Sequence, residues 1–146
     1  MKATQNPPTA APITPADLLR MAALYLRRHG WHQGTYYANS TNNPTPPACA
    51  AGAIGIACAG YRVEHFSQLD PDALADYLTA LGVFVDYLDT TAPVFFVDED
   101  GYLLDEHTSP YSWNDDPART AEQVITALQA AADEWDSLHS EGGEKR

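Results

Sequence analysis

The chain has 146 residues, of which 45% are hydrophobic and 19% charged, a length and composition typical of one soluble domain with a hydrophobic core. Its formal net charge of -12 argues against direct binding of DNA or RNA, because phosphate contacts need clustered Lys and Arg. The charge is uneven: residues 1–65 carry five basic and two acidic side chains (net +3), whereas residues 66–146 carry three basic and 18 acidic ones (net -15).

The N-terminal residues lack the apolar stretch of a secretory signal and are polar and rich in proline. We therefore expect a cytoplasmic protein with a disordered arm over residues 1–13. A single globular domain is expected over residues 14–139, followed by a frayed tail over residues 140–146. No apolar run reaches the about 17–25 residues of a membrane span, so no membrane partner is expected.

The first predicted helix has clear start and stop signals. Thr14 fits an N-cap, Pro15 the first helical position, and Asp17 the acidic position of a capping box. The apolar spacing that follows predicts a helix to about His29, with Gly30 directly after it.

The small, apolar run from Ala48 to Ala59 predicts a second helix, after a loop without periodicity. Its glycines allow close backbone approach, so we expect this helix to lie between the first and the last helix. One set of residues should be buried together: Cys49, Gly52, Ile56, Leu128 and Trp135. In such a helix Cys49 and Cys58 are about 13 Å apart on opposite faces, so they cannot form a disulfide.

A third helix is predicted from Asp70 to Leu81, stopped or kinked at Gly82. Residues 83–88 fit either a strand or a continued helix. Farther along, two apolar runs at 94–97 and 102–104 flank an acidic turn and predict a β-hairpin.

A last amphipathic helix is predicted from about Ala121 to Leu138. The fold class that follows is mainly α, with α+β possible: a helical core of about four helices with a small β-hairpin.

The segment from Trp113 to Thr120 precedes the last helix and combines turn-forming residues with a helix cap. Thr120 with Gln123 fits a capping box. We assign this segment to fold stability, with Asn114 or Asp115 bonding nearby backbone amides. The competing hypothesis is a polar ligand site made by Asn114, Asp115 and Arg119, with Trp113 as its apolar wall.

Cys49 lies at a predicted helix start, where backbone amides lower the pKa of a thiol. This is the setting of a papain-like nucleophile, and three histidines are candidate bases, none with a diagnostic spacing: His32, His65 and His107. A small buried Cys that only packs is the competing interpretation. A Cys49-dependent hydrolase or transferase is therefore the alternative function.

The acidic turn at 98–101 does not fit a calcium loop, because Phe96 takes the place of the first ligand. No Cys or His pair has zinc spacing. We predict no metal and no cofactor.

Aromatic residues in predicted loops, Tyr111 among them, either line a binding surface or close the ends of the core. The candidate binding residues are Trp31, Gln33, Tyr36, Tyr37, Trp113, Asn114, Asp115 and Arg119. The preferred function is a small acidic protein that acts by binding a protein partner with a basic surface.

Three pieces together resemble an uncharacterised family of short actinobacterial and actinophage proteins: Gly30-Trp31-His32-Gln33-Gly34, Cys49-Ala50-Ala51-Gly52-Ala53, and Trp113-Asn114-Asp115 with Arg119-Thr120. The resemblance covers most of the chain and departs in the acidic stretch between Gly82 and Ser112. It implies a bacterial or phage cytosolic accessory protein and carries no assigned activity.

Overall fold

The structure, a computed structural model, describes residues 12–38, 42–91, 95–97, 99–101, 103–105 and 108–144. Its elements are the helices α1 (Pro15–His29), α2 (Ala50–Ala59), α3 (Pro71–Thr91), α4 (Pro110–Asn114) and α5 (Ala121–Glu144), the 3-10 helix η2 (Phe66–Gln68), and the strands β2 (Phe95–Val97) and β3 (Leu103–Asp105). The predicted mainly α fold is confirmed. Most of the predicted N-terminal arm, residues 1–11, lies outside the described residues.

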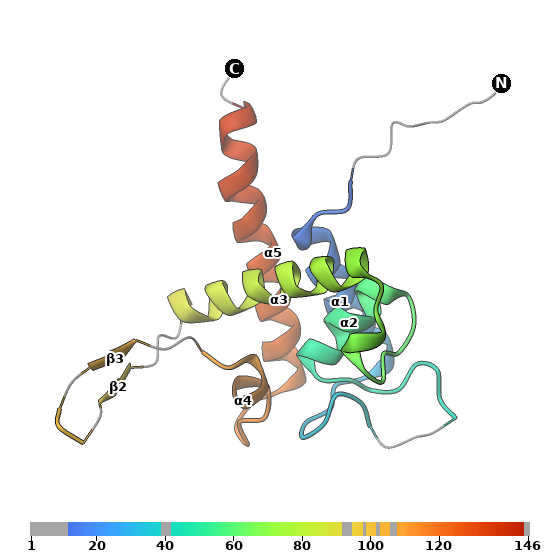
Figure 1. The fold of residues 1–146 in the computed structure, drawn as a ribbon, viewed down its shortest axis with the longest axis horizontal. Helices are drawn as coiled ribbons and strands as arrows, with labels where there is room; N and C mark the ends of the chain where they lie inside the picture. The colour runs from blue at the N-terminus through green and yellow to red at the C-terminus, as the bar shows by residue number, and fades with distance from the viewer. Residues whose placement is uncertain are drawn as a thin grey trace.

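Helix α1 is the central helix and packs against α5, α2 and α3 (Figure 1). Its buried side chains recur at helical spacing: Ala16, Leu18, Leu19, Ala22, Ala23 and Leu26. The main contacts of α2 are with α1 and α3. The prediction that α2 lies between α1 and α5 is therefore wrong; α1 lies between α2 and α5.

The glycines of α2 explain this difference. A Cβ on Gly52 would lie 2.6 Å from the carbonyl oxygen of Tyr36, and one on Gly55 would lie 2.6 Å from the ring of Phe66. The glycine faces of α2 thus receive a loop and an aromatic ring rather than α5.

The predicted buried set is only partly buried. Cys49 and Leu128 are 5% and 0% exposed. Ile56 and Trp135 lie at the edge of the core, and Trp135 stacks on His139 with 3.9 Å between ring centroids. The set is split because Leu128 faces α1 from α5, whereas Cys49 lies at the start of α2.

Both predicted capping boxes are present. The Asp17 amide donates to Thr14 Oγ1 at 3.1 Å, and the Thr14 amide donates to Asp17 Oδ2 at 3.0 Å. At the start of α5, Thr120 and Gln123 make the same two bonds at 3.0 and 3.2 Å. These bonds supply partners for amides that a helix start leaves unpaired.

Helix α3 continues through Gly82 to Thr91, so the predicted stop at Gly82 is wrong and residues 83–88 are helical. Gly82 is exposed, with nothing within 4 Å of the place of a Cβ. Tyr77, Ala80, Phe84 and Leu88 keep helical spacing on the buried face across this glycine. Their burial outweighs the roughly 1 kcal/mol cost of one helical glycine.

Strands β2 and β3 pair antiparallel, with Phe96 opposite Leu104, and extend away from the helices (Figure 1). Helix α5 ends at Glu144, later than the predicted end at Leu138. In the described part of the chain, every helix is too short or too polar to cross a membrane.

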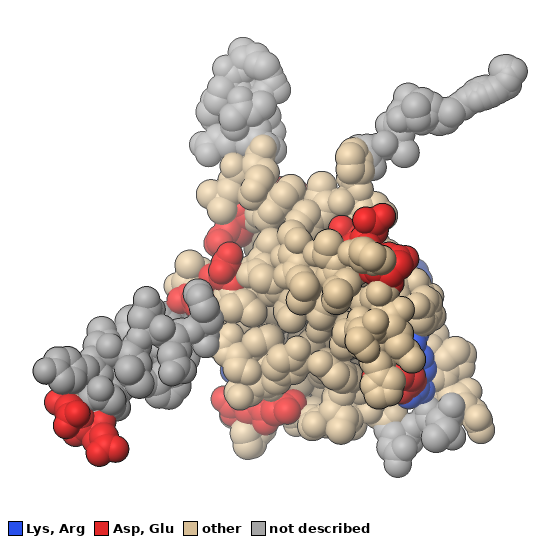
Figure 2. Space-filling view, viewed as in Figure 1, with Lys and Arg blue, Asp and Glu red and all other residues tan. Residues whose placement is uncertain are grey.

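Ion pairs join the basic first part of the sequence to the acidic second part. Arg20 on α1 lies 2.7 Å from both Asp133 and Asp136 on α5, and Arg27 lies 3.3 Å from Glu122. These pairs are exposed and contribute about 0–1 kcal/mol each. The three α5 acids Glu122, Asp133 and Asp136 therefore already have arginine partners. Figure 2 shows acidic side chains in separate groups over the face in view.

Candidate functional site

A cavity of about 400 Å³ opens where three segments meet: the loop at residues 31–37, the start of α2, and α4 with the turn after it. Its lining residues are Gly34, Thr35, Tyr36, Cys49, Tyr111, Asn114 and Asp115. Backbone bonds hold the loop to the start of α2, from the His32 amide to the Ala48 carbonyl and from the Cys49 amide to the Tyr36 carbonyl, both at 2.9 Å.

Asn114 joins the three segments. Its Oδ1 accepts from the Trp31 indole N–H at 2.8 Å and from the Ala50 amide at 3.0 Å. Its Nδ2 donates to the His32 carbonyl at 3.1 Å and to Asp115 Oδ1 at 2.9 Å. The side chain is 1% exposed and makes four hydrogen bonds. A buried side-chain amide whose hydrogen bonds are all formed holds its partners in place, since each unformed hydrogen bond costs free energy.

Asp115 and Gln33 continue this connection at the surface. Asp115 Oδ1 also accepts from the Gly34 amide at 3.0 Å. Gln33 donates from Nε2 to the carbonyls of Asn114 and Asp116, at 3.0 and 2.9 Å. These bonds hold the Asp115 carboxylate in place at the cavity.

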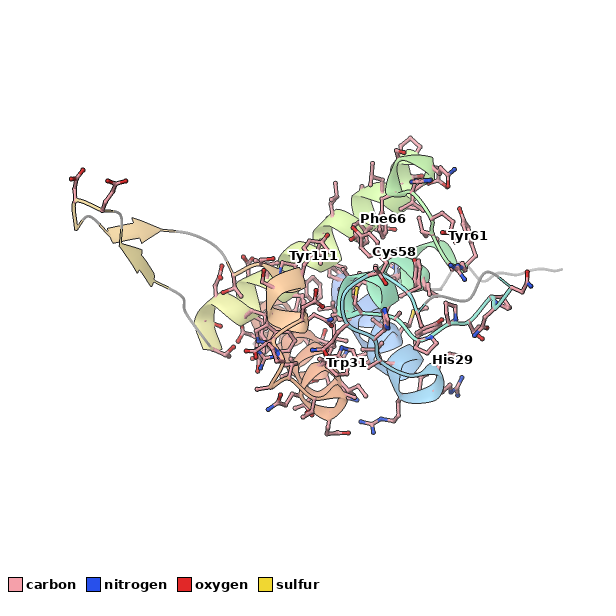
Figure 3. The ribbon with its side chains drawn as sticks, turned by 90° about the horizontal axis from the view of Figure 1, so that it is seen from below. His29, Trp31, Cys58, Tyr61, Phe66 and Tyr111 are labelled. Carbon is pink, nitrogen blue, oxygen red and sulfur yellow. The ribbon has the colours of Figure 1, made fainter. Side chains whose placement is uncertain are left out.

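Aromatic rings form another wall. Tyr36 packs edge-on against both Phe66 and Tyr111, with ring centroids 5.1 and 6.0 Å apart. The Tyr36 and Tyr111 hydroxyls are 3.5 Å apart. Phe66 stacks on Tyr77 of α3 at 4.2 Å. In Figure 3, Phe66 and Tyr111 both lie on the side of α2 that faces α3.

The Tyr77 hydroxyl is a buried polar group next to these aromatic rings. Tyr77 is 3% exposed, and its hydroxyl forms no well-aligned hydrogen bond with a described residue. Burial raises the pKa of Tyr77, and the neighbouring Tyr111 hydroxyl raises it further. The sequence did not single out Tyr77, because a Tyr on the apolar face of a helix is typical of the core. Its hydroxyl could have marked it, since a buried hydroxyl needs a hydrogen-bond partner.

Cys49 is the N-cap of α2, and its Sγ accepts from the Gly52 amide at 3.3 Å. Burial raises the pKa of the Cys49 thiol, and the nearby Asp115 carboxylate adds to the rise, against the lowering by the Gly52 and Ala51 amides. The expectation of a lowered pKa at this helix start is therefore wrong. Desolvation of the thiolate outweighs the amide dipoles.

None of the three candidate histidines is among the described residues that line the cavity. His32 bonds Thr35 Oγ1 through Nε2 at 2.9 Å. His65 is exposed and directly precedes η2. His107 lies outside the described residues.

Trp113 and Arg119 lie away from this cavity. Trp113 packs edge-on against Phe84 at 5.7 Å, and the Arg119 guanidinium lies 4.0 Å from the centroid of the Trp113 ring. Arg119 Nε also donates to the Trp113 carbonyl at 2.9 Å. Trp113 lines a separate hollow of about 340 Å³ between α3 and α5. The four residues of the hypothesised polar ligand site thus do not line one cavity.

Two further predictions about aromatic residues change with the structure. Tyr111 and Trp113 are on α4, not in a loop, because Ser109 caps a short helix that begins at Pro110. Tyr37 is buried, and its hydroxyl accepts from the Val63 amide at 2.9 Å. Burial raises the pKa of Tyr37 to about 12. Tyr37 thus belongs to the core rather than to a binding surface.

Within the described ranges, no group of three or more His, Cys, Asp or Glu could hold a metal ion.

Residues 10–134 match the sequence profile of a family described as a family of unknown function (DUF6197). The chain belongs to this family. The match covers most of the chain, including every residue that lines the cavity of this DUF6197 protein. Neither the curated proteins nor the solved structures give a match to the chain.

Proposed function

We propose that this protein is a small accessory protein of a bacterial or phage cytoplasm that acts by binding a protein partner with a basic surface. The observation that carries the proposal is the Asp115 carboxylate, held at the rim of an aromatic cavity that no cation lines among the described residues. A carboxylate in such a place favours a positively charged partner.

The distribution of the other charges supports the same proposal. Asp72, Asp76 and Asp86 are exposed on α3. Arg119 is the only Lys or Arg among the described residues after position 65, and it is engaged by the Trp113 ring and by Asp116. Exposed acids that form no ion pair attract a basic surface and raise its association rate at low salt.

The alternative, a Cys49-dependent hydrolase or transferase, has less support. The thiol caps its own helix, its pKa is raised by burial, and the described residues that line the cavity include no histidine. A nucleophile needs a thiolate and a base within hydrogen-bond reach.

A matched pair of triple variants tests the proposal. A partner is first identified by affinity capture from bacterial lysate at low salt, with crosslinking and mass spectrometry, and its association rate is then measured. The test variant is Asp72→Asn, Asp76→Asn and Asp86→Asn. The control variant removes the same charge from acids already paired with arginines: Glu122→Gln, Asp133→Asn and Asp136→Asn.

We expect the association rate to fall several-fold in the test variant and less in the control, and to fall in the wild type as salt rises. Equal rates in both variants, or rates that do not depend on salt, would contradict the proposal. Turnover in a general hydrolase screen that disappears with Cys49→Ser would favour the enzyme instead.

A further inference from the structure

The cavity has one charged group among its lining residues, the Asp115 carboxylate. Its Oδ1 is occupied by the Gly34 amide and the Asn114 Nδ2 at 3.0 and 2.9 Å. Both of these hydrogen bonds end on Oδ1, and because Asp115 is exposed, its Oδ2 is accessible to a donor from outside.

The rest of the cavity suits the apolar stem and charged head of an alkylammonium group. Tyr36 and Tyr111 present aromatic rings, and Tyr111 is 41% exposed at the cavity. Aromatic faces attract cations, and their edges and Cβ atoms pack against methylene groups. The two tyrosine hydroxyls, 3.5 Å apart, add acceptor oxygens.

The buried Tyr77 hydroxyl lies beside that of Tyr111 and forms no well-aligned hydrogen bond with a described residue, but Tyr77 does not itself line the cavity.

An anion does not fit the same cavity. The α2 amides that would bind it are used, since the Ala50 amide donates to Asn114 Oδ1 and the Gly52 amide donates to Cys49 Sγ. The Asp115 carboxylate would repel it. An ammonium group has only donors and can bind through one carboxylate oxygen, whereas a guanidinium binds best to two, and Asp115 Oδ1 is already occupied.

We infer that this cavity receives a lysine side chain of the protein partner, with its ammonium group at Asp115 and its methylene stem between Tyr36 and Tyr111. The inference rests on the proposed function, because it assigns the anchor residue of that basic partner. It predicts that a free lysine derivative binds the cavity without the rest of the partner.

The probe is Nα-acetyl-lysine methylamide, titrated into the full chain and followed by the backbone amide resonances of Gly34 and Asp115. Nα,Nε-diacetyl-lysine methylamide, which has no charge, and Nα-acetyl-arginine methylamide are the comparison ligands. We expect saturable shifts at these two amides with the lysine probe, much weaker ones with the arginine probe, and none with the diacetylated probe. Shifts of equal size with the diacetylated probe, or tighter binding of the arginine probe, would overturn the assignment to lysine.

Three variants locate the binding. Asp115→Asn keeps the Oδ1 acceptor and removes the charge, and should weaken the lysine probe about tenfold or more. Tyr111→Ala, which removes one of the two aromatic rings that line the cavity, should also weaken it. Asp133→Asn removes an equal charge from α5, outside the cavity lining, and should leave binding of the probe unchanged.

The same variants separate this inference from the proposed function. If Asp115→Asn leaves both the probe and the captured partner bound as in the wild type, the cavity is not the anchor, while the salt-dependent partner binding stands. If no partner shows salt-dependent binding, the proposed function fails, whether or not the lysine probe binds.

Discussion

Replacement of Asn114 by alanine tests whether the site is held together as the hydrogen bonds indicate. The Asn114 side chain is 1% exposed and accepts from the buried Ala50 amide and the Trp31 indole N–H. Each donor left without a partner costs about 1–3 kcal/mol, so the two together cost about 2–6 kcal/mol. Asn114 lines the cavity, and water that enters there replaces part of the loss. We therefore expect the free energy of unfolding to fall by about 3 kcal/mol.

The assay is guanidinium denaturation, followed by tryptophan fluorescence and far-UV circular dichroism. For a chain of this size, 3 kcal/mol corresponds to a melting temperature lower by roughly 6–12 °C. Asn42→Ala, at an exposed position, is the control and should stay within about 0.5 kcal/mol of the wild type. If Asn114→Ala changes the free energy of unfolding no more than this control does, the Asn114 hydrogen bonds do not hold the site together.

Three other predictions concern helix packing, capping and the thiols. Gly52→Ala should lose about 1–3 kcal/mol in denaturant unfolding, because its Cβ would lie 2.6 Å from a backbone carbonyl. Gly82→Ala should gain about 0.5–1 kcal/mol, because nothing lies within 4 Å of the place of its Cβ. Stability changes of the same sign in the two variants would contradict one of these two predictions. Thr120→Ala should cost about 1 kcal/mol of stability, and an unchanged melting curve would show that the cap contributes nothing. Burial raises the pKa of both thiols, that of Cys58 to about 11, so iodoacetamide should label both slowly near pH 7, with Cys58 labelling faster as the pH nears 11. Rapid labelling of Cys49 at neutral pH would restore the nucleophile hypothesis.

Local interactions in this protein could be predicted from the order of residues. The Thr14 and Thr120 capping boxes each join residues three positions apart. The apolar spacing of α1 follows the same local rule. Such features depend on neighbours within one helical turn, and for this reason the starts of α1 and α5 and the mainly α class could be predicted.

The site and the order of packing depend on contacts between distant positions. Trp31 and Asn114 are 83 positions apart. From its neighbours in the sequence alone, Asn114 could either stabilise the fold or form part of a polar ligand site. The length of α3 depended on whether its buried face continued past Gly82, which only its packing against the other helices decided. The Cys49 pKa follows from how deeply the neighbouring segments bury the thiol. Burial depends on the whole tertiary structure, because the atoms that cover a group come from every part of the chain. Apolar spacing and helix caps, in contrast, depend only on residues within one helical turn.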